Sequence, residues 1–292
     1  MNRKKFSRRI LCLLPLGILL FLVVLMFVLQ TVVAHQFQAF VPPYAQTDLQ
    51  EVWDRQVLTE EDYSLFFRQT GLGKPAVDDL RGKGDVGYRW LLDIQTSFFA
   101  PREVLCRPLG FITQEERLTD ENGALTYGAT LAPLQNGDIL LSFSTHTYGW
   151  RHGHAGLVVD AAQGVTLEAA VWGEHSGKAS ADFWRTYSTV LVLRPKGMTP
   201  ELRAEVTAFA LDALDDVPYH LTSGVFGDKA PEEDVVAQCS YLVWYAYQHF
   251  GLDLDSDGGR IVTVNDLAES DLLEVVQVYG LDPSAFPVSH KD

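Results

Sequence analysis

One segment near the N-terminus limits what this chain can fold into more than any other feature of its sequence. An apolar run without any charge extends from Ile10 to about Ala34, and Gln30 and Thr31 are its only polar members. A helix needs roughly 20 apolar residues to cross the hydrocarbon layer of a membrane. The run is also longer than the roughly 7–15 apolar residues of a typical signal-peptide core. We therefore predict a transmembrane helix over residues 10–34.

Basic residues in front of this run predict its orientation. Residues 1–9 contain five cations and no acid: Arg3, Lys4, Lys5, Arg8 and Arg9. Such a basic tip is expected to stay in the cytoplasm while the rest of the chain is exported. The alternative is a long signal peptide cleaved after Ala34, with Val32 and Ala34 at the small-residue positions. We favour a retained single-pass anchor, and both interpretations place residues 35–292 outside the cytoplasm.

The rest of the chain is acidic and rich in apolar residues. Hydrophobic residues make up 47% of the chain, which is enough to build a packed core. The formal net charge is −15, and without the five cations of the tip it falls to −20. Phosphate binding needs a basic surface, so nucleic acid is not an expected partner.

Residues 35–130 are expected to form an extracytoplasmic linker and a mainly helical region of unknown role. Thr59 and Asp62 have the spacing of a capping box, and Gly71 is a suitable helix stop. Two helices are predicted here, over residues 60–70 and 75–80. The stretch from residue 82 to about 131 shows no periodicity that assigns its structure.

Residues 131–292 show first a strand pattern and then a helix pattern. Short apolar runs next to turn residues predict four strands, over residues 138–143, 155–159, 165–169 and 189–193. Thr199 and Pro200 then begin a helical pattern, and a second one runs from Cys239 to Phe250 before Gly251. The predicted class is α+β, with a small antiparallel sheet and helices packed beside it.

Cys239 is the candidate nucleophile among the three cysteines, the others being Cys12 and Cys106. It lies in the first turn of a predicted helix, where backbone N–H groups and the helix dipole favour a thiolate. The alternative is that Cys239 is a small buried hydrophobe, as free cysteines often are. A disulfide between Cys106 and Cys239 is also open to an exported chain.

A thiol nucleophile needs a base, and the base needs an orienting group. His154 stands at the start of a predicted strand, and Glu168 ends the next strand fourteen residues later. If the two strands form a hairpin, Glu168 lies beside His154 and can fix its tautomer. Alternatively, His154 and Glu168 are ordinary surface residues.

Two metal sites are weaker alternatives. His152 and His154, with Glu168 or with Glu174-His175, have a spacing that could hold a metal ion. The run Asp253, Asp255, Asp257, Gly258 resembles the start of a calcium loop, but the twelfth position is Val264 rather than glutamate. We therefore expect a solvated acidic turn there, and neither a metal nor another cofactor.

Several short segments resemble the NlpC-type papain-like cell-wall peptidases. The first are Gly137-Asp138-Ile139-Leu140 and His154-Ala155-Gly156-Leu157-Val158, similar to the strands that carry the catalytic histidine. The next are Pro218-Tyr219 and Gln238-Cys239-Ser240-Tyr241-Leu242-Val243, similar to the tyrosine and nucleophile segments. The histidine block precedes the cysteine block, which is the order of the circularly permuted YaeF/YiiX-like amidases. Two late stretches, residues 251–255 and 264–267, also fit that branch.

The resemblance covers roughly residues 130–270 and implies a permuted papain-like catalytic domain over residues 131–292. It implies Cys239 as nucleophile, His154 as base, Glu168 as third member and Tyr219 as a helper that holds the oxyanion. A catalytic Cys239 cannot be in a disulfide with Cys106, so its thiol is expected to be free. Tyr241 and Gln238 depart from the small residue and the Asp usual at those places, which leaves substrate preference open.

An exported cysteine hydrolase follows as the expected function. The resemblance implies that it cleaves an amide bond in cell-wall peptide through an acyl-enzyme. A lipid-directed hydrolase or acyltransferase is the first alternative, because related papain-like folds act on acyl chains. An inactive binding module is the second.

Overall fold

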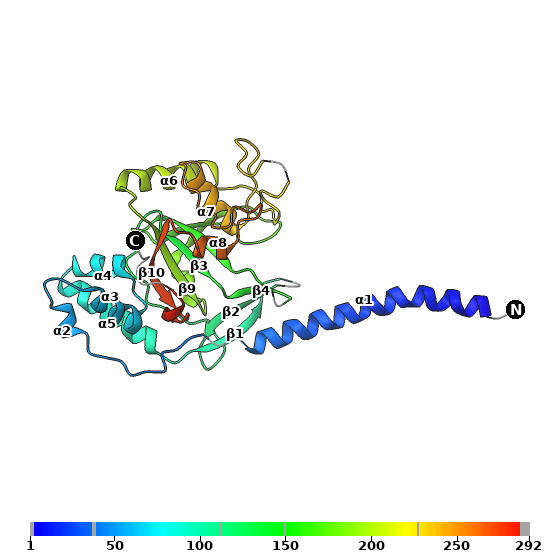
Figure 1. Ribbon diagram of the computed structural model, residues 1–292, viewed down its shortest axis with the longest axis horizontal. Coiled ribbons are helices and arrows are strands. Elements are labelled where there is room, and N and C mark those ends of the chain that lie inside the picture. Colours follow the sequence, from blue (N-terminus) through cyan, green and yellow to red (C-terminus); the bar gives the residue numbers. More distant parts are fainter. Residues whose placement is uncertain (1–2, 37–38, 111–112, 149, 227, 287–292) are drawn as a thin grey trace.

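Two antiparallel sheets and two groups of helices make up the body of the molecule. The computed structural model describes residues 3–36, 39–110, 113–148, 150–226 and 228–286 (Figure 1). Strands in both sheets pair with antiparallel neighbours. The predicted α+β class is therefore confirmed.

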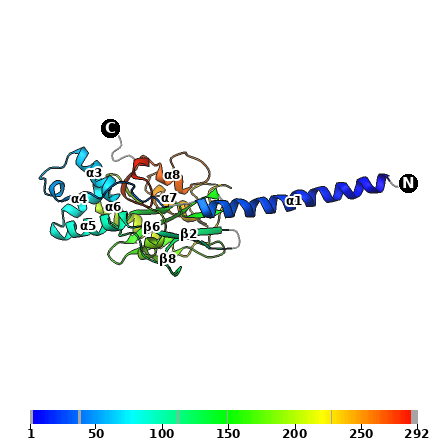
Figure 2. The same ribbon diagram turned by 90° about the horizontal axis from the view of Figure 1, so that it is seen from below.

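The first helix, α1 (Arg3–Gln36), stands away from the body of the molecule (Figures 1 and 2). Its stretch Leu14–Val32 has 19 residues with a mean hydropathy of 2.5, and none of this stretch is buried. An apolar surface of this length left open to solvent is unfavourable. Length and composition suit a single membrane span, and they equally suit a signal sequence.

The larger sheet has six strands in the order β10-β9-β3-β6-β7-β8. Their bounds are β3 Ile139–Ser142, β6 His154–Asp160, β7 Val165–Glu168, β8 Gly177–Ser180, β9 Val190–Pro195 and β10 Leu273–Tyr279. The four predicted strands are present as β3, β6, β7 and β9. The edge strands β8 and β10 were not predicted, and they make the sheet larger than expected.

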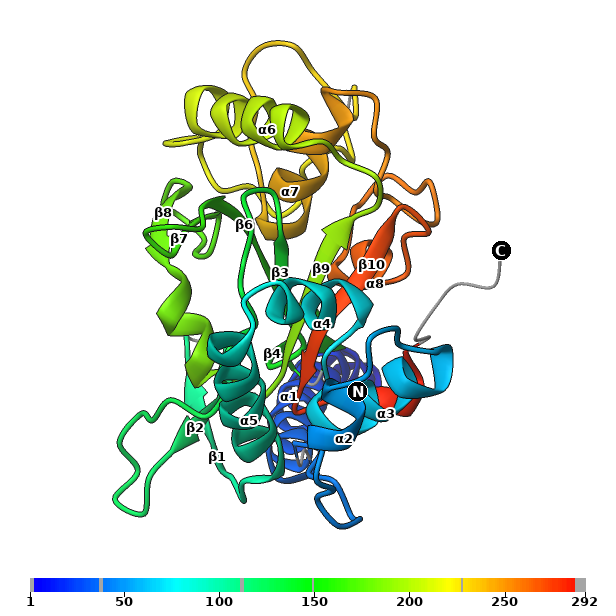
Figure 3. The same cartoon turned by 90° about the vertical axis from the view of Figure 1, so that its left-hand side faces the viewer.

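Helices cover both faces of this sheet, as Figure 3 shows. One face carries α6 (Pro200–Ala213), α7 (Cys239–Gln248) and α8 (Val264–Ala268). The other carries α2 (Gln50–Trp53), α3 (Glu60–Thr70), α4 (Lys74–Arg81) and α5 (Asp85–Phe99). Successive strand residues point to opposite faces, so Ile139 and Leu141 join the first core while Leu140 joins the second.

The smaller sheet has four strands in the order β1-β2-β4-β5. They are β1 Glu103–Pro108, β2 Thr113–Thr119, β4 Thr145–Thr147 and β5 Trp150–Arg151. Two short 3-10 helices, η1 (Ala181–Thr186) and η2 (Pro283–Ala285), complete the elements. Together with α5, β1 and β2 fill most of the stretch that the sequence left unassigned.

The helix signals in the sequence are confirmed at both ends of α3. The Thr59 side chain accepts from the Asp62 N–H, and the Asp62 carboxylate accepts from the Thr59 N–H. At the other end Gly71 adopts a φ of 73°, a left-handed conformation that favours glycine. A Cβ at Gly71 would also lie 2.1 Å from the Val278 carbonyl oxygen.

A buried ion cluster joins the larger sheet to α4. The Arg194 guanidinium in β9 donates to both carboxylate oxygens of Asp138, at 2.7 and 2.8 Å. It also donates to Asp79 of α4 at 2.7 Å. Such paired, charge-assisted bonds hold their partners in one orientation. Asp138 of the Gly137-Asp138 motif therefore stabilises the sheet from which the candidate site is built.

Replacing Arg194 with methionine should lower the free energy of unfolding by about 3–5 kcal/mol, because Asp138 would stay buried without its partner. Urea denaturation of the detergent-solubilised chain measures this change. The double variant Arg194→Met/Asp138→Leu should recover part of the loss, since it leaves no unpaired charge. An equal or larger loss in the double variant would contradict the role of the pair.

Candidate active site

Cys239 is the first residue of α7, and the turn before it is fixed by Gln238. The Gln238 Oε1 accepts from the backbone N–H of Ser240 at 3.0 Å and from its hydroxyl at 2.9 Å. Its amide nitrogen donates to the Val262 carbonyl oxygen at 2.6 Å. Gln238 thus caps the helix in place of the usual Ser, Thr, Asp or Asn. The thiol is held at a helix N-terminus, as the sequence predicts.

His154 begins β6, directly under α7. It pairs in register with Ser142 of β3, and α7 packs against β6. Gly153 before it has a φ of 72°, and a Cβ there would lie 2.5 Å from the Ser142 carbonyl oxygen. Glycine is therefore required where the chain enters the strand. This packing places His154 and Cys239 close enough for each to shift the pKa of the other, and the Cys239 thiol donates to Gln238 Oε1 at 3.4 Å.

Glu168 ends β7, the strand next to β6, as the predicted hairpin requires. Its Oε2 lies 2.6 Å from Nε2 of His154. Because Nε2 faces the carboxylate, Nδ1 is the ring nitrogen left for the thiol. The other carboxylate oxygen accepts from Trp184 Nε1 at 2.8 Å and from the Thr166 hydroxyl. Both oxygens of Glu168 are thereby held in place.

Trp184 of η1 supports His154 and Glu168 from a second direction, and no pattern in the sequence predicts this role. Its ring stacks on the His154 ring with centroids 5.3 Å apart and an interplanar angle of 13°. Gly156 makes room for this arrangement, because a Cβ there would lie 2.9 Å from Trp184 and 3.1 Å from Glu168. The contact of Thr166 with Glu168 could have been predicted from the sequence, because two residues that are two positions apart on a strand share a face.

The electrostatics favour a thiolate–imidazolium pair. Burial alone would lower the pKa of His154, but hydrogen bonds and charges from Cys239 and Glu168 raise it to about 10. Burial alone would raise the pKa of Cys239, but His154 and backbone hydrogen bonds from Ala155 and Ser240 lower it. Burial also opposes the charge on Glu168, yet its pKa is lowered by His154, Thr166 and Trp184.

Tyr219 lies close enough to Cys239 for the charge of the thiolate to change the pKa of its phenol. It forms a parallel bridge with Ala237, two residues before the cysteine. Burial, and then the negative charge of Cys239, raise the pKa of its phenol. The hydroxyl stays protonated near neutral pH and can therefore donate a hydrogen bond.

The histidine metal site proposed as an alternative is not formed among the described residues. His152 bonds the Thr147 hydroxyl at 3.0 Å and lies outside β6, so it does not share a strand face with His154. His175 bonds Asp216 on the surface. Cys106 is also far from pairing with Cys239: both thiols are free, as expected for Cys239.

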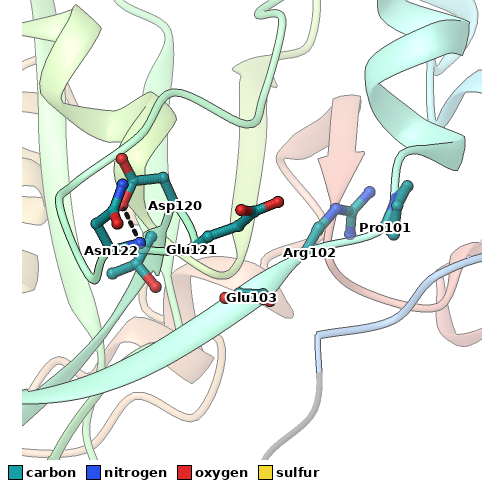
Figure 4. A pocket seen from close by; sticks show the side chains of 7 residues that line it. Pro101, Arg102, Glu103, Asp120, Glu121 and Asn122 are labelled. Atoms are coloured by element: carbon teal, nitrogen blue, oxygen red, sulfur yellow. Dashed lines mark hydrogen bonds between the residues drawn. The ribbon is translucent and has the colours of Figure 1, made fainter.

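A surface pocket lies elsewhere, where β1 and β2 meet the end of α5. It is lined by Pro101, Arg102, Glu103, Thr119, Asp120, Glu121 and Asn122 (Figure 4). In Figure 4 the only hydrogen bond drawn joins Asn122 to Asp120, within one turn. The lining contains no cysteine or histidine, so the chemistry suggested above does not belong to it.

Comparison with known proteins adds one distant likeness. No protein-family model matches the chain, and no curated protein matches it. Among solved structures it is similar to the metalloprotein YiiX of Escherichia coli O157:H7, with 16% identity and a TM-score of 0.39. The alignment covers 49% of this chain and 97% of that one. The family resemblance seen in the sequence, including the wider NlpC relationship, stays a prediction.

The pairing of Cys239 with His154 predicts how fast iodoacetamide labels the thiol at each pH. In the intact chain labelling should already be fast well below the ordinary cysteine pKa, because the protonated His154 stabilises the thiolate. His154→Gln removes the positive partner, so burial then dominates and the labelling midpoint should move up by more than about one pH unit. His175→Gln is the matched control. An unchanged midpoint in His154→Gln would rule the pair out.

Gly156→Ala should weaken the Cys239–His154 pair although neither residue of the pair is replaced. The new Cβ forces Glu168 or Trp184 to shift, so His154 loses part of its orienting bond and its pKa falls. The midpoint of Cys239 labelling against pH should move up by about one unit, because the thiolate loses part of its stabilisation. Gly177→Ala in β8 meets nothing within 4 Å and should label like the unmodified chain. Equal midpoints in the two variants would show that the space at Gly156 is unimportant.

Proposed function

We propose that this chain is an exported cysteine hydrolase that cleaves an amide bond through an acyl-enzyme. Residues 131–292 form the proposed catalytic domain, which has a circularly permuted papain-like fold. Cys239 is the nucleophile, His154 the base, Glu168 the orienting acid and Tyr219 an oxyanion donor. The observation that carries the proposal is the 2.6 Å contact between His154 and Glu168, where the helix that begins at Cys239 packs against the strand of His154.

The proposed reaction begins with the thiolate. Cys239 attacks the substrate carbonyl, and the oxyanion that forms is held by the Cys239 N–H and the Tyr219 hydroxyl. The first N–H groups of a helix have no partner within the helix, so this donor is available at the first residue of α7. His154 then gives its proton to the leaving amine, and water activated by His154 releases the acyl group.

A cell-wall peptide is the proposed substrate, on the basis of export and the resemblance. We propose that α1 is retained as a single-pass anchor and that the domain works outside the cytoplasm, next to the membrane. A secreted form cleaved near Ala34 is the alternative. The region 35–130, whose helices pack on the sheet face opposite α7, would then support the catalytic domain.

A lipid-directed hydrolase or acyltransferase is the second candidate, and one observation favours it. Large apolar side chains are exposed on loops that follow the site residues. Trp172, four residues after Glu168, is 81% exposed, and Phe226, seven after Tyr219, is 83% exposed. Exposed aromatic rings at such positions are typical of surfaces that contact membranes or acyl chains.

Substrate assays with the full chain in detergent test both candidates. Wall-peptide fragments and acyl lipids are offered separately, and release of a free amine or a free acyl chain is measured. His154→Gln should lower turnover by at least about 10²–10⁴, and Cys239→Ala should abolish it. Cys106→Ala, the matched control, should retain full turnover.

Each outcome has a clear meaning for the function. Amine release that depends on Cys239 supports the wall amidase, and acyl release that depends on Cys239 supports the lipid enzyme instead. Turnover that persists in Cys239→Ala would contradict a cysteine mechanism. Absence of turnover with every substrate, together with slow thiol labelling, would favour an inactive binding module.

A further inference from the structure

An acidic cluster lies in the stretch between α7 and β10, beside the turn that holds Cys239. It consists of Asp255, Asp257 and Asp266. One carboxylate oxygen of each residue lies within 4.8 Å of the other two. The sequence predicted a solvated acidic turn over residues 253–258, and this prediction is wrong for Asp255, which is buried. Asp266, which lies outside that turn, is buried as well. Asp257 is exposed and leaves the cluster open to solvent.

Asp255 contributes an unsatisfied buried oxygen to this cluster. The residue is 8% exposed and its side chain is fully buried. Its Oδ2 is bonded by the Lys229 ammonium group. Its Oδ1 is buried and has no hydrogen-bond partner. A buried carboxylate oxygen without a partner is costly, unless a cation or a water occupies the space that it faces.

The other two members each keep an oxygen for a ligand. Asp257 accepts from the Gly259 N–H through Oδ1, and Asp266 accepts from Thr263 through Oδ2. Each of these bonds uses one oxygen of its carboxylate. Lys229 bonds Asp255, whereas the groups that bond Asp257 and Asp266 here are uncharged.

We propose that Asp255, Asp257 and Asp266 bind a calcium ion. All donors are oxygens, which suits a hard cation, and the site is irregular and partly open, which suits Ca²⁺ better than Mg²⁺. The spacing Asp253-x-Asp255-x-Asp257-Gly258 is that of a calcium loop, with Gly258 at a φ of 66° in the sharp turn. Val264 stands where such a loop has its glutamate, and Asp266 supplies the carboxylate from two residues farther on.

The site is connected to the nucleophile through Val262. Its carbonyl oxygen accepts from the Gln238 amide at 2.6 Å and from the Ser240 hydroxyl at 2.9 Å. Val262 lies within the loop that runs from Asp257 to Asp266. A cation that joins the two ends of this loop therefore stabilises the carbonyl on which the helix cap beside Cys239 depends.

Calcium titration of the full chain in detergent, after treatment with EDTA, tests the proposal. Isothermal calorimetry with CaCl₂ should give a dissociation constant of about 10⁻⁴–10⁻³ M, the range of extracellular calcium modules. The thermal midpoint should rise by several degrees at 10 mM CaCl₂, as ligand linkage requires, and MgCl₂ should bind at least about tenfold more weakly. These readouts do not require the chain to be an enzyme.

Asp257→Asn is the informative variant, because Asp257 is exposed and its loss should leave the fold intact. It should bind calcium at least tenfold more weakly and lose most of the thermal shift. Asp93→Asn, an exposed acid in α5, should respond like the unmodified chain. The proposal is overturned if the unmodified chain shows no heat and no thermal shift, if Mg²⁺ binds as tightly as Ca²⁺, or if Asp257→Asn responds fully. The titration of the unmodified chain decides on its own if a variant does not fold.

Discussion

The candidate site depends on three charged groups that are buried together: the Cys239 thiolate, the His154 imidazolium and the Glu168 carboxylate. Burial disfavours each of these charges when it is taken alone. Each is stable because it faces its opposite, and because the remaining oxygens and N–H groups around it are bonded. Removal of one member therefore changes the protonation of the other two, and the three groups have to be treated as one unit.

The architecture supplies the three groups from three elements whose relative positions are fixed independently. β6 and β7 are neighbours in the sheet, so His154 and Glu168 meet across one strand pair. α7 packs on the same face, and Gln238 orients its first turn. Arg194 of β9 bonds Asp138, just before β3, and Asp79 of α4, and so holds these three elements together. The rigid sheet thus positions His154 and Glu168, while a capped helix end positions Cys239.

The sequence predicted what depends on local patterns. The capping box of α3, the strands β3, β6, β7 and β9, and the helices α6 and α7 follow from turn residues and periodicity, and the structure confirms them. The edge strand β10 was not predicted, and it pairs with β9, from Leu273 opposite Pro195 to Tyr279 opposite Val190, far apart in the chain. Trp184 and the space at Gly156 were missed as well. Their importance lies in contacts across the sheet, which leave no trace in residue spacing.

A second Cys–His pair shows why residue type alone does not define such a site. The Cys106 sulfur lies 3.5 Å from Nε2 of His146, a contact that resembles a catalytic pair. Burial and the charge of Glu116 raise the pKa of Cys106 to about 11, and burial and the charge of Arg151 lower that of His146. Both groups are therefore neutral near pH 7. Glu116 lies 3.8 Å from Nε2 of His146, but both of its oxygens accept from Arg151, so the arginine already balances its charge. Glu168 instead faces His154, and its other partners, Trp184 and Thr166, are uncharged. A carboxylate paired with an arginine leaves a buried Cys–His contact neutral, whereas a carboxylate committed to the imidazole supports an ion pair.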